Sequence, residues 1–157
     1  MIVVADTSPL NYLVLIDEIE LVPVLFGHVL LPQAVLQELL HPKTSLKVRR
    51  WVTSAPAWLE VHGVVSAPVP ELTGLDLGER EAIQLALELG IDTVLIDEAD
   101  GRRQAELLHL EVRGTLGILE RGARLGRTDL RHALHRLAQT NFRVSEAVYA
   151  AFLKRNP

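Results

Sequence analysis

The chain has 157 residues and a net charge of −4; 48% of its residues are hydrophobic, 4% are aromatic and none is cysteine. This composition predicts one folded domain with an aliphatic core, and it excludes disorder, disulfides, zinc–thiolate sites and cysteine nucleophiles. No apolar run reaches the length of a membrane span and the N-terminus shows no basic leader, so we expect a cytoplasmic protein.

The first element predicted is a short strand over Ile2–Ala5, because this run is apolar and partly β-branched, as in a buried parallel strand. Asp6 follows directly, and Thr7 or Ser8 then suits the cap of a helix whose first turn contains Pro9. Asp6 is therefore expected at the carboxyl end of a buried strand, where ligands gather in open α/β sheets. The alternative is that Asp6 only caps the helix.

The rest of the chain alternates between short apolar runs and segments with a helical period. Further strands are predicted at 28–31, 58–62, 93–96 and 110–113. Helices are predicted at 10–26 with a break near Asp17, and at 33–40, 45–54, 77–89, 101–109, 114–124, 128–138 and 145–153, with a linker at 63–75. This alternation indicates βαβ units, and hence an α/β fold: a three-layer α/β/α sandwich around a mainly parallel five-stranded sheet.

We find no internal repeat and no domain boundary. Residues 1–157 are therefore predicted to form a single domain, with a core at 1–120 and C-terminal helices at 121–157. Those helices carry apolar side chains that either close the core, which is the commoner use, or form a dimer surface. These are Phe142, Val144, Val148, Tyr149, Phe152 and Leu153.

Charge is distributed unevenly along the chain. Residues 1–100 contain 5 Lys or Arg and 15 Asp or Glu, whereas residues 101–143 contain 9 Arg, no Lys and 4 acids. A carboxylate-rich region beside an Arg-rich one suits a metal site next to a phosphate-bearing partner, because the guanidinium group matches phosphate oxygens. Solvated helix surfaces are the alternative explanation, and the commoner one for charge runs in general.

Four acids occupy positions that suggest a metal-binding or catalytic role. Asp6 and Asp97 each end a predicted strand, Glu38 lies among apolar residues of its helix, and Glu79 lies in a first helical turn. Carboxylates that converge on one pocket repel one another unless a cation neutralises them, and all-oxygen ligands suit Mg²⁺ or Mn²⁺. Taken singly, each acid also has a structural explanation: a helix cap, a surface position, or a favourable interaction with a helix dipole.

The predicted site acids lie in four segments of the chain: Val3–Leu10, Leu31–Leu39, Leu77–Ile83 and Val94–Glu98. In this order the segments resemble the PIN domain, and more narrowly the branch found as toxins beside a small antitoxin gene. The turn Gly114–Gly117 also fits that branch. The resemblance covers roughly the first 120 residues. It implies a PIN-like fold and a metal-dependent ribonuclease of the VapC kind, which cleaves RNA with Mg²⁺ or Mn²⁺, forms a homodimer and is silenced by a cognate antitoxin protein.

The resemblance also implies roles for individual residues. Glu79 matches an acid that is Asp in most VapC proteins, and Glu81 is an alternative candidate for this position. Glu98 and Asp100 lie near enough to Asp97 to share its role. The catalytic and metal-binding acids implied are Asp6, Glu38, Glu79 and Asp97, and the substrate-binding residues are Thr7, Ser8 and Thr115.

Two functional hypotheses stay open. One is an endoribonuclease toxin; the other is a catalytically weak or inactive PIN-like module that binds a protein, motivated by the Glu at the third position and the acidic charge. A phospho-acceptor receiver domain is disfavoured, because it would need a second acid beside Asp6 and a Lys after the last strand. No Lys occurs between positions 48 and 153.

Overall fold

The computed structural model describes all residues, 1–157. Its sheet has five strands in the order β3-β2-β1-β4-β5, and every neighbouring pair is parallel. The central strand is therefore the N-terminal one, as its uninterrupted apolar sequence predicts. The strands are β1 (Ile2–Ala5), β2 (His28–Pro32), β3 (Leu59–His62), β4 (Thr93–Leu95) and β5 (Glu111–Arg113), each within one residue of its predicted bounds.

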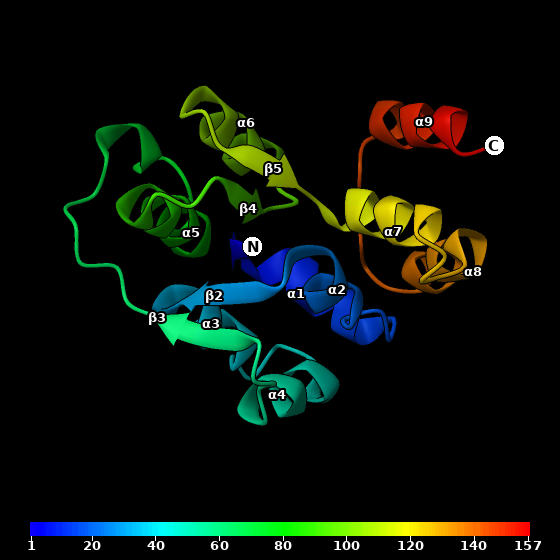
Figure 1. Cartoon of the computed structure of the whole chain (residues 1–157), viewed down its shortest axis with the longest axis horizontal. Helices are drawn as coiled ribbons and strands as arrows, with labels where there is room; N and C mark the ends of the chain where they lie inside the picture. Colours follow the sequence, from blue (N-terminus) through cyan, green and yellow to red (C-terminus); the bar gives the residue numbers. More distant parts are fainter.

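Helices cover both faces of this sheet (Figure 1), which confirms the three-layer α/β/α arrangement. The α5 and α6 helices pack on one face, and α1, α2, α4, α7 and α8 pack on the other. The helices are α1 (Thr7–Leu15), α2 (Leu21–Phe26), α3 (Gln33–Leu39), α4 (Leu46–Thr53), α5 (Leu77–Leu89), α6 (Ala99–Leu107), α7 (Thr115–Arg124), α8 (Leu130–Ala138) and α9 (Glu146–Arg155), with a 3-10 turn η1 at Pro70–Leu72.

Alternate residues of β1 build two separate cores. Val3 and Ala5 belong to the larger core, under α1, α2 and α7, whereas Val4 belongs to the smaller core, under α5 and α6. All three side chains are fully buried. A strand with both faces buried has no position for a polar residue, so the first carboxylate occurs where the strand leaves the sheet.

The boundaries of some helices differ from the prediction. The expected cap at Thr7 or Ser8 is wrong, because α1 begins at Thr7 and Asp6 occupies the cap position. The α8 helix begins at Leu130 and not at residue 128, because Asp129 caps it by accepting a hydrogen bond from the N–H of His132. The hydroxyls of Thr7, Ser8 and Thr128 donate instead to side chains distant in sequence, which a local capping rule does not detect.

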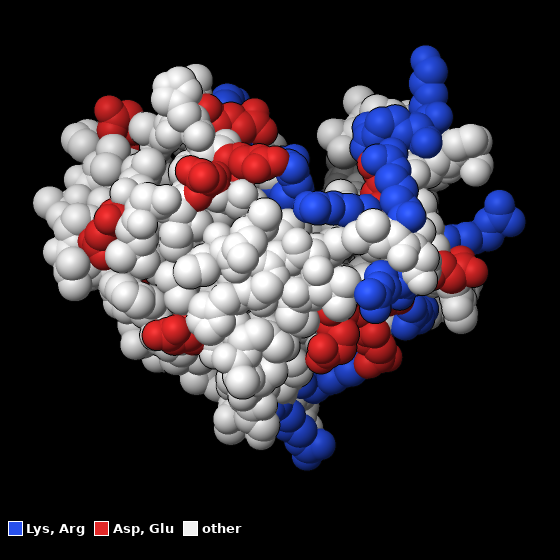
Figure 2. Space-filling model, viewed as in Figure 1, with Lys and Arg blue, Asp and Glu red and all other residues white.

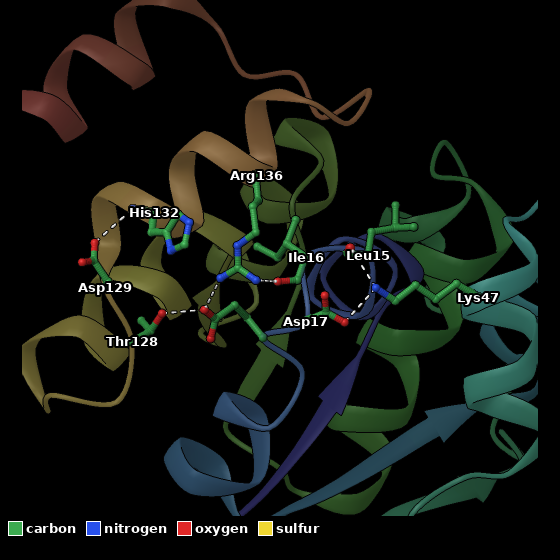
Figure 3. Close-up of polar contacts among 9 residues, drawn as sticks. Leu15, Ile16, Asp17, Lys47, Thr128, Asp129, His132 and Arg136 are labelled. Carbon is green, nitrogen blue, oxygen red and sulfur yellow. Dashed lines mark hydrogen bonds and ion pairs between the residues drawn. The ribbon is translucent and has the colours of Figure 1, made fainter.

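The turn between α1 and α2 is held by α8. Arg136 donates hydrogen bonds to the carbonyl of Ile16 and, at 2.7 Å, to Oε1 of Glu18. The hydroxyl of Thr128 donates to the same oxygen at 2.6 Å. Figure 3 shows the Arg136 side chain reaching from α8 to the carbonyl of Ile16. We call Glu18, Thr128 and Arg136 the α8 latch, because they tie α8 to the N-terminal half of the chain.

The same turn is held from its other side by α4. Asp17 has a positive φ of 61°, which explains the break predicted at this residue. Lys47 on α4 donates to the Asp17 carboxylate at 2.7 Å and to the carbonyl of Leu15 at 3.3 Å (Figure 3). The α1–α2 turn is thus fixed between two helices that are distant in sequence.

The C-terminal helix only partly closes the core. Phe152 is buried, whereas Val148 remains 54% exposed and Tyr149 40% exposed. The helix is attached to α7 through Asn156, whose side chain donates to Glu120 at 2.7 Å. On the face of the molecule that Figure 2 shows, many of the Lys and Arg side chains lie over α7, α8 and α9.

None of the helices is both long enough and apolar enough to cross a membrane.

Candidate functional site

A pocket of about 900 Å³ receives the residues that follow β1 and β4. The chain runs outward from β1 to β2 and β3, then returns to place β4 on the other side of β1, so the two strands flank the topological switch point. Ligand sites of open α/β sheets lie at this point. Seven acids line the pocket, including all four predicted ones: Asp6, Glu38, Asp76, Glu79, Asp97, Glu98 and Asp100.

Asp6 lines this pocket and is only 5% exposed. Its backbone N–H donates to the carbonyl of Leu95, which continues the hydrogen-bond ladder between β1 and β4. Its side chain makes no capping hydrogen bond to α1, so helix capping does not account for it. Burial raises the pKa of Asp6 to about 7, opposed by the N–H of Thr7 and reinforced by neighbouring carboxylates. These are Asp76, Glu38 and Asp97.

Glu79 approaches Asp6 from α5 and is 4% exposed. Its Oε2 atom is buried and has no hydrogen-bond partner. Burial raises the pKa of Glu79 well above its usual range, and contact with Asp76 and the charges of Asp6 and Glu98 act in the same direction. An unpartnered buried carboxylate oxygen is costly, so this arrangement favours either a bound proton or a cation.

Glu81 has a different, structural role. Its Oε1 atom accepts a hydrogen bond at 3.0 Å from the N–H of Ala34, in the first turn of α3. The N-cap of α3 is Pro32, whose side chain cannot accept a hydrogen bond from the first turn of the helix. Glu81 on α5 provides this missing acceptor. The geometry therefore favours Glu79 over Glu81 as the acid that faces the pocket.

Asp97 is the most extensively hydrogen-bonded of the four acids. Its carboxylate accepts bonds from the hydroxyl of Ser8 at 2.9 Å, and from the N–H and hydroxyl of Thr115 at 2.7 Å each. It thus joins the first turns of α1 and α7 instead of capping the helix that follows it. Glu98 and Asp100 lie at the exposed rim, where Asp100 pairs with Arg103 at 3.0 Å.

Glu38 lines the pocket from α3, so the plain surface position that was its structural explanation does not account for it. The hydroxyl of Thr7 donates to its Oε2 atom. Two of the predicted substrate-binding residues, Thr7 and Ser8, thus line the pocket while bonding to site acids. The third, Thr115, is fully buried and reaches the site only through Asp97.

Three glycines lie directly beneath site carboxylates. A Cβ atom built on Gly78, Gly101 or Gly114 would come within 3.0 Å of a carboxylate oxygen. The oxygens belong to Glu38, Glu79 and Asp97, respectively. Only a residue without a side chain permits this approach, so the backbone of α5, of α6 and of the residue before α7 packs directly against these carboxylates.

The pocket contains residues that sequence reasoning missed. Asp76 caps α5, its Oδ1 accepting from the N–H of Glu79 at 3.0 Å, and it lines the pocket. Its position directly before the Leu77–Leu89 helix was a capping signal that could have identified it. Asn141, Phe142 and Arg143 also line the pocket. Arg143 belongs to the Arg-rich segment expected beside the metal site, but nothing in the sequence signalled Asn141 and Phe142.

The chemistry of these donors suits a hard divalent cation, because the pocket gathers carboxylate oxygens and one of them is buried without a partner. The site is not preassembled, however: no three His, Asp or Glu side chains already stand in an arrangement that would hold a metal ion. The carboxylates of Glu38 and Asp97 are turned toward hydroxyl groups instead. Ligation would require these side chains to reorient.

The fold and pocket define an α/β protein with an acidic pocket at the switch point of a parallel sheet. A family model described as a PIN domain matches residues 2–156, and the chain therefore belongs to the PIN-domain family. PIN domains are generally nucleases that bind RNA and use divalent metals. No curated protein and no solved structure matches the chain. The match extends over the C-terminal helices, beyond the segments that carry the resemblance in the sequence.

Proposed function

We propose that this protein is a Mg²⁺- or Mn²⁺-dependent endoribonuclease that hydrolyses RNA phosphodiester bonds. The observation that carries the proposal is the buried Oε2 atom of Glu79, which has no partner and lies in the same pocket as the buried Asp6. Two adjacent buried carboxylates are stable as anions only with a compensating positive charge. In a PIN domain, a divalent cation is the natural source of that charge.

The residues of the pocket divide the work. The four acids Asp6, Glu38, Glu79 and Asp97 would hold the cation, which when bound supplies charge neutralisation and activation of the attacking water. Thr7 and Ser8 donate to Glu38 and Asp97 and so orient them. When these carboxylates turn to the cation, the two hydroxyls would become free to donate to the substrate phosphate. Thr115 positions Asp97 from the opposite side.

The resemblance to the toxin branch supports a narrower proposal. The protein would act as the toxin of a type II toxin–antitoxin pair, with a cognate antitoxin that blocks the acid pocket. A homodimer is part of this proposal, and the exposed apolar side chains of α9, Val148 and Leu153 among them, offer a surface for it. The molar mass of the purified protein, measured by light scattering, tests the homodimer.

A second candidate function is a PIN-like module that binds protein without useful cleavage. The observation that favours it is the lack of a preassembled ligand set, together with the three hydrogen bonds that occupy Asp97. The two candidates differ in one measurable property. The nuclease must bind a divalent cation through Asp6 near neutral pH, whereas the module has no need to do so.

Isothermal titration of Mn²⁺ is expected to show binding that tightens as the pH rises from about 6 to about 8. The pKa of Asp6 without metal is about 7, so below this pH the cation must displace a proton and above it the carboxylate is already charged. The pKa of Glu79, raised to about 8, adds a second proton that the cation must displace. Each displaced proton gives up to a tenfold change in affinity per pH unit, and affinity should level off only above the pKa of Glu79.

Asp6→Asn and Asp92→Asn form a matched pair for this titration. Asp92 is exposed and precedes β4 at the opposite end of the strand from the pocket. Asp6→Asn should abolish Mn²⁺ binding and the cleavage of total RNA, while Asp92→Asn should retain both. Wild-type protein that binds no Mn²⁺ at either pH would refute the nuclease; Mn²⁺ binding through Asp6 without cleavage of any RNA would favour the module.

Gly101→Ala is expected to weaken Mn²⁺ binding roughly 10- to 100-fold, the usual cost of disturbing the surroundings of a ligand. The added methyl group would take the space of the buried Glu79 carboxylate. Gly117→Ala is the control, because Gly117 also lies in a helix but has nothing within 4 Å of a built Cβ. Equal Mn²⁺ affinity in both variants would show that Glu79 is not a ligand.

A further inference from the structure

The connector between α8 and α9 forms a wall of the acid pocket, although it lies far from the other pocket residues in sequence. Asn141, Phe142 and Arg143 all line the pocket. The connector is attached to α1 through Tyr12, whose hydroxyl donates to Oδ1 of Asn141 at 2.8 Å. The rings of Tyr12 and Phe142 also meet edge to face, with centroids 5.0 Å apart and planes at 78°.

Arg143 is an unpaired cation in a strongly acidic pocket. Among the lining residues, seven are acidic and only Lys43 and Arg143 are Lys or Arg. Neither cation takes part in an ion pair, and Arg143 donates only to backbone carbonyls, of Phe142 at 2.9 Å and Thr140 at 3.5 Å. The guanidinium group is therefore free to bind an anion that the carboxylates alone would repel.

The aromatic pair lies close to the acids. Tyr12 follows Ser8 by one turn of α1, and Ser8 bonds to Asp97. Burial raises the pKa of Tyr12, with the Asp97 carboxylate acting in the same direction and the Arg143 guanidinium opposing it, so both charges act on this hydroxyl. Tyr12 and Phe142 are only half-buried, which leaves aromatic surface within the pocket.

We propose that Tyr12, Phe142 and Arg143 form a subsite for one unpaired nucleotide of the RNA substrate. The base stacks on the aromatic pair and the guanidinium binds the adjoining phosphate, which places the next phosphodiester at the acids. Stacking on aromatic side chains needs an unstacked base, so the subsite selects single-stranded over duplex RNA. The inference rests on the proposed nuclease function, for which it names residues that bind the substrate.

The test measures binding of a fluorescent single-stranded RNA by anisotropy, over a range of salt concentrations, with Ca²⁺ in place of Mg²⁺ so that the RNA stays intact. Arg143→Gln should lower the slope of log K against log salt by about 0.7, the value for one lost phosphate contact, and Arg143→Lys should restore it. Phe142→Leu should weaken binding roughly 5- to 100-fold without changing the slope. Neither change should affect a duplex of the same sequence.

Arg131→Gln is the matched control, because Arg131 is an exposed arginine of α8 that does not line the pocket. Equal effects of Arg131→Gln and Arg143→Gln on the slope, with unchanged melting temperatures, would overturn the subsite. So would equal weakening of single-stranded and duplex binding by Phe142→Leu.

A cleavage assay on the same RNA, with Mn²⁺ in place of Ca²⁺, separates this inference from the proposed function. Wild-type protein that cleaves RNA but whose Arg143 and Phe142 variants bind normally would refute only the subsite. Binding that depends on Arg143 and Phe142 in a protein that cleaves nothing would refute only the nuclease. Wild-type protein that binds no RNA would refute both.

Discussion

Asp6→Asn is expected to raise the free energy of unfolding of the metal-free protein by up to about 4 kcal/mol at pH 8 or above. The pKa of Asp6 is about 7 in the fold against an ordinary value of 3.8, so the folded state resists ionisation that the unfolded chain undergoes freely. The resulting cost is absent below about pH 4, grows between the two pKa values, and is constant above the folded one. Asparagine carries no charge and avoids it.

Urea denaturation at several pH values, in the presence of a chelator, measures this effect. The difference between Asp6→Asn and wild type should vanish near pH 4 and increase up to pH 8, whereas exposed Asp92→Asn should stay within about 0.5 kcal/mol throughout. Saturating Mn²⁺ should stabilise wild type alone and so reduce or reverse the difference. A destabilised Asp6→Asn variant at pH 8 would show that the Asp6 carboxylate is well satisfied without a cation.

Arg136→Met is expected to lower the free energy of unfolding by about 2–3 kcal/mol. The substitution keeps the aliphatic part of the side chain but removes the donors to the carbonyl of Ile16 and to Glu18. The Glu18 side chain is only 13% exposed, so its carboxylate would lose its one cationic partner in a place where water replaces it poorly. The α8 latch would then be reduced to the Thr128 hydroxyl.

The urea midpoint measures this loss, and Arg131→Met on the exposed face of the same helix is the control, expected within about 0.5 kcal/mol of wild type. A double-mutant cycle with Glu18→Gln isolates the interaction between the two latch residues, which should lie between roughly 0.5 and 3 kcal/mol. A coupling energy near zero would show that Arg136 acts only by packing. Because α8 leads into the pocket wall, the variant should also weaken RNA binding.

The sheet could be predicted from the sequence because its strands have a simple physical signature. Val3 to Ala5 and Val94 to Leu95 are buried on both faces, so each strand is an apolar run that ends abruptly at a carboxylate. Since the strands are parallel, their carboxyl ends meet at one edge, and this places Asp6 and Asp97 in one pocket. The meeting of Asp6 and Asp97 could therefore be predicted from the strands alone, without knowing where the helices lie.

The orientation of the helices could not be predicted in the same way. Glu79 and Glu81 are two positions apart on α5 and therefore face nearly opposite directions, but only the packed structure shows that Glu79 faces the pocket while Glu81 caps α3. The contact between Tyr12 and Asn141 spans 129 residues, and no local pattern specifies it. Contacts of this kind depend on how the elements pack, so the pocket wall at Asn141 and Phe142 was missed, although Arg143 lies in the Arg-rich segment that the sequence places beside the site.

Because three glycines pack against the site acids, the positions of these carboxylates depend directly on where the main chain lies. Gly78 lies in α5, Gly101 in α6 and Gly114 directly before α7, and each touches a site carboxylate without an intervening side chain. A small sliding of one of these helices would press its backbone against the carboxylate beside it, so that side chain would have to change rotamer and the distances between the acids would change. A partner that binds the outer surface of α6 or α7 and shifts the helix would in this way change the distances between the site acids without entering the pocket.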